Sequence, residues 1–446
     1  MTTKVLNNIV LQAFVGFAVA SVFVSCRFED EDYFDKPAAQ RIEATTQDIK
    51  ETLVAQENGW VMQYFTGSEG IEGFNLFVRF ENSNKVTVAG NHRFLRGGNA
   101  NKYTENASLY EMLNEDGPVL AFNTWNDVLT PFVDPVDPSA APKNLVKDGE
   151  GMKGDHNFVV LSYSSDEVLL RGERHSARVR LVPCKQSWKE YIDATEKMKN
   201  YFATPTIANY YVTNGTDTLY FKGLRSGAFT YCERINDPLF PSTLNCVFTP
   251  DGFRMHHPNS IGGTRFTEFH MAADSTCLVS ENDSVRVIAL WDTYIVSHAA
   301  LWPLKQDLFT QTQKQLVESI NTQVKKFSAT YELESVNMGR SSGSDNVYGL
   351  VLRFYTNSAK TKYTTAGMAL GISRPEFGKM KITYSDNASI DKNMKTLVGR
   401  IGEEFQATVG QLAETFAGEY ALVPDNYFLP TSVVLNGSDG KTLRLN

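Results

Sequence analysis

The sequence predicts an α+β fold in which antiparallel β-sheet predominates, arranged as two lobes with several amphipathic helices packed on the sheets. Short segments of alternating apolar and polar residues follow one another closely, and the clearest, residues 73–81, places four apolar side chains on one face. Two longer segments, residues 307–327 and 391–416, carry apolar residues at helical intervals. The 28 Phe and 19 Tyr residues give a composition that favours strands.

The first lobe is expected to span residues 38–203. It begins with a helix that ends near Asn58-Gly59, because Gly is a common helix stop. Strands follow wherever alternating residues lie between turn signals, a Pro-rich loop interrupts them at residues 130–154, and a helix from Trp188 closes the lobe. The expected strands are residues 60–65, 73–81, 85–88, 108–113, 118–123, 156–163, 167–171 and 177–182.

The second lobe is expected to span residues 204–446, with the two long helices set among strands. The order helix, strand, Gly-led strand at residues 38–81 occurs again at residues 307–355, so a distant duplication of these two segments is a hypothesis. The expected strands are residues 207–212, 218–221, 228–232, 244–248, 252–256, 264–271, 284–291, 328–334, 347–354, 366–373, 379–384, 420–422, 427–435 and 442–445.

Residues 1–25 have the features of a bacterial lipoprotein signal peptide. Lys4 precedes an apolar run, and the small residue Ser25 stands directly before Cys26. We expect the Cys26 thiol to carry lipid that holds the mature chain on a membrane, and residues 26–37 to form an acidic tether. An uncleaved transmembrane anchor and a buried N-terminal helix remain the alternatives.

The net charge of −8 argues against a nucleic-acid partner, which needs clustered Lys and Arg. Besides Cys26 the chain has four cysteines: Cys184, Cys232, Cys246 and Cys277. Either Cys232 and Cys246 form a disulfide or all four are buried thiols.

The adjacent His256 and His257 should point to opposite faces of a strand, so they cannot readily chelate one ion. We expect no metal and no cofactor.

No motif assigns a catalytic residue, since neither a nucleophile elbow nor an H-E-x-x-H sequence is present. The paired carboxylates of a glycoside hydrolase leave no local pattern, so a polymer hydrolase with unlocated carboxylates stays open. The acidic residues in and near the Pro-rich loop match no calcium-binding loop, and we expect them to be solvated. They are Asp134, Asp137, Asp148, Glu150 and Asp155.

Trp125 is the best candidate for an exposed, ligand-stacking aromatic residue. Most aromatic residues on strands belong to a core, whereas Trp125 stands between a strand and the Pro-rich loop. Its neighbours Asn123, Asn126 and Asp127 supply the donors and acceptors that a carbohydrate site uses. These four residues form the predicted ligand site.

Several segments together resemble a family of surface lipoproteins of unknown function from Bacteroidetes. They are Phe34 to Ile42, Asn58 to Trp60, Gly73-Phe74, Gly117 to Asn123, Gly154 to Phe158 and Leu169 to Gly172. The resemblance implies an accessory of starch-utilisation-type outer-membrane uptake systems, with an uptake complex and a glycan as partners. It assigns no catalytic residue.

The resemblance also implies an address and modifications. Glu29, Asp30, Glu31 and Asp32 are similar to the signal that sends such lipoproteins to the cell exterior. Three tripeptides are similar to bacterial O-glycosylation sequences, and their acceptor residues are Thr218, Ser275 and Ser284. We therefore expect an outer-membrane, lipid-anchored, outward-facing protein that binds a glycan or glycopeptide without catalysis. A hydrolase and a structural or adhesive envelope protein are the alternatives.

Overall fold

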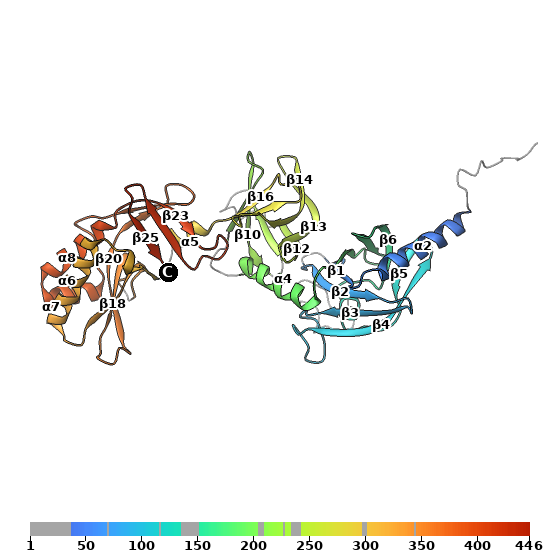
Figure 1. The fold of residues 1–446 in the computed structure, drawn as a ribbon, viewed down its shortest axis with the longest axis horizontal. Helices are drawn as coiled ribbons and strands as arrows, with labels where there is room; N and C mark the ends of the chain where they lie inside the picture. Colours follow the sequence, from blue (N-terminus) through green and yellow to red (C-terminus); the bar gives the residue numbers. More distant parts are fainter. Residues whose placement is uncertain are drawn as a thin grey trace, which may run out of the picture.

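The computed structural model describes residues 37–68, 71–115, 117–134, 151–203, 209–225, 228–232, 242–296, 301–342 and 345–446. Two closed barrels and a C-terminal α+β unit follow one another along the molecule (Figure 1). Every pairing between named strands is antiparallel, and helices pack on the sheets. The α+β prediction is confirmed. The predicted second lobe holds two distinct sheet systems, the second barrel and the C-terminal unit.

Barrel 1 is an eight-stranded meander in which each strand pairs with the next and β8 pairs back with β1. Its strands are β1 (Trp60–Phe65), β2 (Phe74–Phe80), β3 (Lys85–Gly90), β4 (Thr104–Asn114), β5 (Pro118–Phe122), β6 (Asn157–Tyr163), β7 (Val168–Gly172) and β8 (Arg178–Pro183). Apolar side chains fill its interior, as expected for a barrel of this size.

The two ends of barrel 1 differ. Helix α2 (Ala38–Val54) lies across one end, where Ile49 and Leu53 are buried in the barrel core. Short turns join the strands at this end. At the other end, which we call the rim, the connections are residues 66–73, 91–103, 123–156 and 173–177. The third of these contains α3 (Thr130–Val133). The ring centroid of its Phe132 lies 5.3 Å from the ring centroid of Tyr64, near the end of β1.

Barrel 2 repeats the meander with eight further strands, and β16 pairs back with β9. They are β9 (Asn209–Thr213), β10 (Thr218–Arg225), β11 (Ala228–Cys232), β12 (Ser242–Phe248), β13 (Gly252–Ile261), β14 (Thr264–Met271), β15 (Leu278–Ser280) and β16 (Arg286–Ala289).

Helix α4 (Trp188–Ala203) contacts both barrels (Figure 1). Near its start, Trp188 and Tyr191 cover apolar side chains on the outer wall of barrel 1, including Val61 and Phe77. Near its end, Phe202 is buried in barrel 2. The helix covers Val61 on the outer face of β1, and all six residues of β1 are buried, the polar Gln63 among them.

The C-terminal unit contains a four-stranded and a five-stranded sheet, and three of its helices pack against one another and against the first sheet. Its buried residues continue the core of barrel 2 without a break. Its elements are α5 (Trp291–Val296), β17 (Trp302–Pro303), η1 (Gln306–Leu308), α6 (Gln311–Phe327), β18 (Glu332–Arg340), β19 (Tyr348–Tyr355), β20 (Tyr363–Ala369), β21 (Gly371–Ser373), β22 (Lys379–Thr383), α7 (Lys392–Ile401), α8 (Glu403–Thr415), β23 (Gly418–Pro424), β24 (Val433–Gly437) and β25 (Thr442–Leu445).

Hydrogen bonds join the two barrels directly. The N–H of Gly73 donates to the carbonyl of Cys246 at 3.0 Å, and Nδ2 of Asn75 donates to the carbonyl of Phe248 at 2.7 Å. A Cβ at Gly73 would lie 2.5 Å from the ring of Phe65, so only glycine permits this approach. Arg180 of β8 also pairs with Glu268 of β14 at 2.8 Å.

Two sequence expectations need correction, and one hypothesis stays open. The helix predicted over residues 391–416 is two helices, because Gly402 has a φ of +117° that ends α7 before α8 begins. The duplication hypothesis for residues 38–81 and 307–355 stays a hypothesis: each segment is a helix followed by two strands that pair antiparallel, but the first pair belongs to a closed barrel and the second to an open sheet. The rings of His256 and His257 lie 4.0 Å apart rather than on opposite faces, because β13 changes register at this point.

The disulfide alternative is excluded by strand register. Tyr231 pairs with Ser242 and Ala228 with Asn245, so Cys232 and Cys246 lie at opposite ends of the β11–β12 pair. At about 3.3 Å per residue their Cα atoms are roughly 15 Å apart along the strands. A disulfide requires Cα atoms within about 7 Å. Cys184 and Cys277 are buried thiols outside any disulfide, and burial raises the pKa of both.

Candidate functional site

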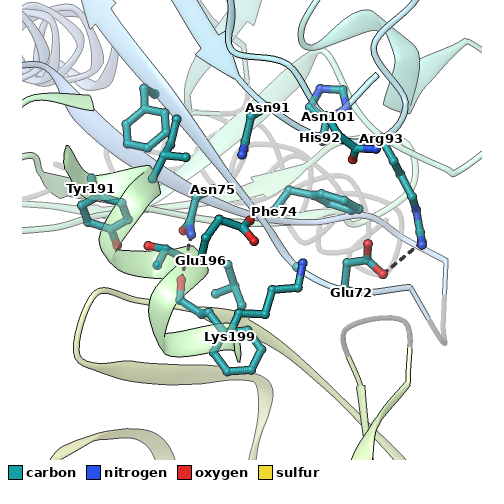
Figure 2. A pocket seen from close by; sticks show the side chains of 16 residues that line it. Glu72, Phe74, Asn75, Asn91, His92, Arg93, Asn101, Tyr191, Glu196 and Lys199 are labelled. Carbon is teal, nitrogen blue, oxygen red and sulfur yellow. Dashed lines mark hydrogen bonds and ion pairs between the residues drawn. The ribbon is translucent and has the colours of Figure 1, made fainter. Parts of the chain in front are cut away.

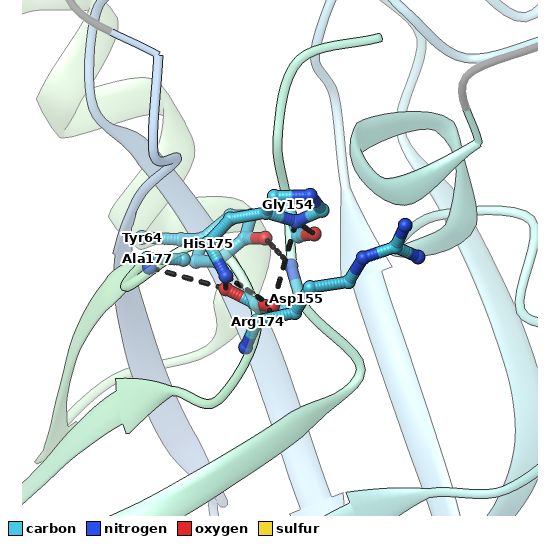
Figure 3. A network of polar contacts seen from close by, with 6 residues as sticks. All are labelled: Tyr64, Gly154, Asp155, Arg174, His175 and Ala177. Carbon is cyan, nitrogen blue, oxygen red and sulfur yellow. Dashed lines mark hydrogen bonds and ion pairs between the residues drawn. The ribbon is translucent and has the colours of Figure 1, made fainter. Parts of the chain in front are cut away.

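The rim of barrel 1 is organised by the buried carboxylate of Asp155 (Figure 3). This side chain is 4% exposed and accepts the backbone N–H groups of Arg174, His175 and Ala177 at 3.0 to 3.1 Å. The N–H of Asp155 donates in turn to the hydroxyl oxygen of Tyr64 at 3.0 Å. The carboxylate therefore fixes the β7–β8 turn against the end of β1.

Asp155 is thus a structural residue and not the solvated loop residue that the sequence indicated. Its oxygens already accept several N–H groups, which satisfies a buried carboxylate without a cation. Asp134 forms an ion pair with Arg96 at 2.9 Å. The other three acidic loop residues, Asp137, Asp148 and Glu150, lie outside the described residues.

Trp125 lies on the rim with 55% of its surface exposed. Its indole N–H donates to Oδ1 of Asp127 at 2.7 Å, and the guanidinium of Arg96 lies over the ring at 5.5 Å from its centroid. Asn106 donates to the second oxygen of Asp127 at 3.2 Å. The ring is therefore held in a fixed orientation, and we call Trp125, Asp127, Arg96 and Asn106 the tryptophan platform.

The other predicted ligand residues differ in their roles. Asn123 is exposed, and its amide donates to Glu111 at 2.7 Å. Asn126 is 1% exposed, and its side chain is fully used in hydrogen bonds that hold the loop, to Asn106, Ser108, Val128 and Leu129. Asn126 therefore shapes the site but cannot contact a ligand, contrary to the prediction. The other four tryptophans, Trp60, Trp188, Trp291 and Trp302, are buried.

A second site, absent from the sequence predictions, lies where barrel 1, α4 and barrel 2 meet (Figure 2). It is a cavity of about 310 Å³, which we call the junction pocket. Its lining comes from the start of β2, the connection 91–103, α4 and the end of β12. The residues are Glu72, Gly73, Phe74, Asn75, Phe77, Asn91, His92, Arg93, Asn101, Tyr191, Ile192, Thr195, Glu196, Lys199, Val247 and Phe248.

Charges of both signs line the junction pocket. Glu72 pairs with Arg93 at 3.0 Å. Burial raises the pKa of Glu72, and the positive charges of Arg93 and Lys199 oppose that rise. Burial also lowers the pKa of His92 to about 4, so its imidazole is neutral near pH 7.

Three lining side chains carry a buried polar atom that has no hydrogen-bond partner among the described residues. They are Oδ1 of Asn75, Nδ1 of His92 and Oγ1 of Thr195. Such atoms are uncommon in proteins and call for an explanation. Sequence reasoning missed this pocket because its wall joins residues as distant as Asn75 and Phe248. The local signal was the polar Asn75, which is partly buried between the apolar residues Phe74 and Leu76 of β2.

The remaining predictions are placed as follows. Cys26 and the acidic residues Glu29, Asp30, Glu31 and Asp32 lie outside the described residues. Ser275 and Ser284 are exposed, and Thr218 is half-buried on β10. Within the described residues, no group of three His, Cys, Asp or Glu side chains is arranged to hold a metal ion. The described helices include none that is both long and apolar enough to cross a membrane.

Comparison with known proteins identifies the family but no function. No curated protein matches the chain. The model of a domain of unknown function, DUF4302, matches residues 30–273, a segment that covers barrel 1 and most of barrel 2. The match spans more than half of the chain and contains the tryptophan platform, Asp155 and the junction pocket. The chain therefore belongs to the DUF4302 family.

Proposed function

We propose that this protein is a lipid-anchored accessory of the cell surface that binds glycans at the tryptophan platform without chemically changing them. The observation that carries the proposal is the exposed and immobilised ring of Trp125. Sugar rings present C–H groups that pack on aromatic faces, while their hydroxyls need nearby polar partners. A ring fixed before binding loses little conformational freedom when a ligand arrives.

The surroundings of Trp125 supply the polar partners. Asp127, Arg96 and Asn106 hold the ring, and the exposed Asn123 stands two residues before Trp125 in the sequence. A cation over the ring and a carboxylate at its indole N–H therefore accompany the exposed aromatic surface. Such a mixture suits a ligand with many hydroxyl groups.

The position of the platform also suits a surface lipoprotein. α2 lies at one end of barrel 1, and the platform lies at the rim on the opposite end. A lipid on Cys26, ahead of α2, would leave the rim pointing away from the membrane. Outer-membrane location, outward orientation and assistance to an uptake complex belong to this proposal.

Binding of the chain from residue 27 to a panel of polysaccharides and oligosaccharides, measured by affinity electrophoresis and calorimetry, tests the proposal. We expect Trp125→Ala to weaken glycan binding at least tenfold without changing the melting temperature. Tyr363→Ala is a matched control, because Tyr363 is 59% exposed and the guanidinium carbon of Arg353 lies 3.7 Å from its ring centroid. Equal glycan binding by wild type and Trp125→Ala would refute the platform as the binding site.

A hydrolase is the second candidate, because Glu72 and Glu196 both line the junction pocket and burial raises the pKa of Glu72. Glycoside hydrolysis uses one protonated and one ionised carboxyl group. Release of reducing sugar by the wild type, lost in both Glu72→Gln and Glu196→Gln, would establish this activity. Intact substrates after prolonged incubation with the wild type would leave the binding function.

A further inference from the structure

Arginine side chains from the two barrels face each other where the barrels meet. On barrel 1, Arg178 and Arg180 point outward from β8, because the residues that alternate with them belong to the core of that barrel. On barrel 2, Arg254 and His256 point outward from β13 for the same reason. We call Arg178, Arg180, Arg254 and His256 the arginine seam.

The first contact across the seam is aromatic. The ring of Phe65 stacks on the imidazole of His256, with 4.6 Å between the two ring centroids. Phe65 is the partner of Arg178 in the β1–β8 pair, so these two side chains leave barrel 1 side by side. Burial, His257, Arg178 and Arg254 together lower the pKa of His256 to about 3. Arg178 therefore lies close to the outer face of β13, beside an imidazole that is neutral near pH 7.

The second contact across the seam is an ion pair that occupies its carboxylates. Nη1 of Arg180 lies 2.8 Å from Oε2 of Glu268 on barrel 2, and Nε of the same guanidinium donates to Glu167 on barrel 1. Glu268 is the partner of Arg254 in the β13–β14 pair, so Arg254 lies beside this ion pair. One guanidinium thus binds both carboxylates of the seam.

Arg178 and Arg254 are left without a carboxylate. Neither forms a hydrogen bond or an ion pair with any residue that the structure describes. Burial and the charge of Arg180 lower the pKa of Arg254 although the two carboxylates oppose them, and the charge of Arg178 adds to the repulsion. The exposed Arg171 is the partner of Arg178 in the β7–β8 pair and brings a further positive charge. The seam therefore has an excess of positive charge drawn from both barrels.

This arrangement of guanidinium groups suits an oxyanion. A guanidinium donates two parallel N–H groups to two oxygens of one anion. A sulfate or phosphate group has oxygens in four directions, so two arginines on opposite walls can bind it at once, whereas a carboxylate offers only two oxygens. Arg178 is exposed and Arg254 is half-buried, so an anion can enter from solvent and reach the inner arginine.

We infer that the arginine seam binds a sulfate or phosphate group between Arg178 and Arg254, either as a free ion or as a substituent of a sugar. The site shares no residue with the tryptophan platform or the junction pocket, and it does not rest on the proposed function. Because the two arginines belong to different barrels, the bound anion also stabilises the contact between the barrels.

The test uses the chain from residue 27 in chloride buffer of constant ionic strength. The probes are inorganic sulfate, inorganic phosphate, a sugar monosulfate, a sugar monophosphate and, as a carboxylate, acetate. Arg178→Gln and Arg254→Gln each remove one cation and keep a polar side chain. Arg286→Gln is the matched control, because Arg286 is an exposed arginine on β16 that forms no hydrogen bond or ion pair with the described residues and lies outside the seam.

Calorimetry measures the affinity, and thermal unfolding shows whether each variant folds. We expect sulfate or phosphate to bind the wild type, about tenfold weaker binding in each seam variant, and unchanged binding in Arg286→Gln. Saturating anion should raise the melting temperature of the wild type but not that of the double variant.

Equal affinity for free ions and for substituted sugars identifies a free-ion site, and tighter binding of a substituted sugar identifies a sugar site. Wild-type affinity in either seam variant, binding of acetate as tight as that of sulfate, or no binding of any sulfate or phosphate probe would overturn the inference. Loss of glycan binding in Trp125→Ala concerns the proposed function alone, and anion binding should persist in that variant.

Discussion

The two barrels have the same architecture but carry different connections. In each, a helix precedes eight meandering strands and buries two apolar residues one helical turn apart, Ile49 and Leu53 in α2 and Met198 and Phe202 in α4. The sequence spacing of the two buried residues is the same in both helices. The number of residues from the second of them to the first strand of the barrel is also the same. The repeated unit of this chain is therefore a helix with the barrel that follows it.

The difference lies in the connection between the fifth and sixth strands. In barrel 1 it is residues 123–156, which hold Trp125 and α3, whereas in barrel 2 it is Gly262 and Gly263 alone. Both glycines have positive φ, as the tightest hairpin turn requires. The connection between the fifth and sixth strands is thus elaborated in barrel 1 and minimal in barrel 2, and loops of this kind carry binding residues on a rigid fold.

The largest expected effect tests whether the buried residues of α4 and α2 have the same role in their barrels. Phe202→Ala should lower the free energy of unfolding by about 4 kcal/mol, because Phe202 packs 4.9 Å from Tyr210 and 5.6 Å from Phe248. Hydrogen exchange should increase through barrel 2 and the C-terminal unit, which share one core. Leu53→Ala should increase exchange in barrel 1 alone, and spread of its effect into barrel 2 would contradict separate cores.

The next prediction concerns the Asp155 network, which is part of the elaborated rim. Asp155→Ala should lower the free energy of unfolding by about 3 kcal/mol, because three backbone N–H groups lose their acceptor, and that of Ala177 is buried. Asp274→Ala is the control, since the exposed Asp274 accepts one N–H from Thr276 in a turn of barrel 2, and its loss should cost under about 1 kcal/mol. Urea unfolding measures both, and equal effects would show that Asp155 is dispensable.

Acid should weaken the rim through His92. Burial lowers the pKa of His92 to about 4, so the unfolded chain binds a proton below about pH 6.5 that the folded chain does not. The contribution of His92 is complete above pH 6.5 and decreases as the pH falls towards 4, by up to about 3 kcal/mol. The free energy of unfolding, measured in urea between pH 7 and 4, should decrease less steeply for His92→Gln than for the wild type. Parallel pH profiles of the two proteins would show that His92 does not cause the acid sensitivity.

The smallest expected effect tests the bare turn of barrel 2. Gly263 has a φ of +81°, so Gly263→Ala should lower the free energy of unfolding by about 1 kcal/mol although no atom lies within 4 Å of the added carbon. Gly399→Ala in α7 is equally uncrowded but helical, and it should stabilise by up to about 1 kcal/mol. Thermal unfolding distinguishes the signs, and a destabilised Gly399→Ala would refute the backbone explanation.

Local patterns predicted many strands, because alternation and turn residues act over short distances, but the expected strand 427–435 is wrong over residues 427–432, which precede β24. The predicted segments 60–65 and 228–232 coincide with β1 and β11. Closure of the barrels was not predictable in this way, since it depends on pairing β1 with β8 across most of the lobe. The helical stripe across Gly402 was misleading, because apolar spacing continued through a glycine that ends one helix and precedes the next.

The candidate sites show the same limit. The loop position of Trp125 correctly indicated an exposed ring, but the same position did not reveal that the adjacent Asn126 is buried. The junction pocket combines segments from two barrels, and no local pattern links Asn75 to Phe248. Residues that meet only through tertiary contacts require the structure.

The double contact of α4 gives the assembly of this molecule a direction. Its first turns need the finished outer wall of barrel 1 to cover Trp188 and Tyr191, and its last turn supplies the side chains around which barrel 2 closes. A chain that is synthesised from its N-terminus can therefore fold barrel 1 before barrel 2 begins to fold. We expect folding to proceed in sequence order, with each folded unit providing the surface against which the next unit packs.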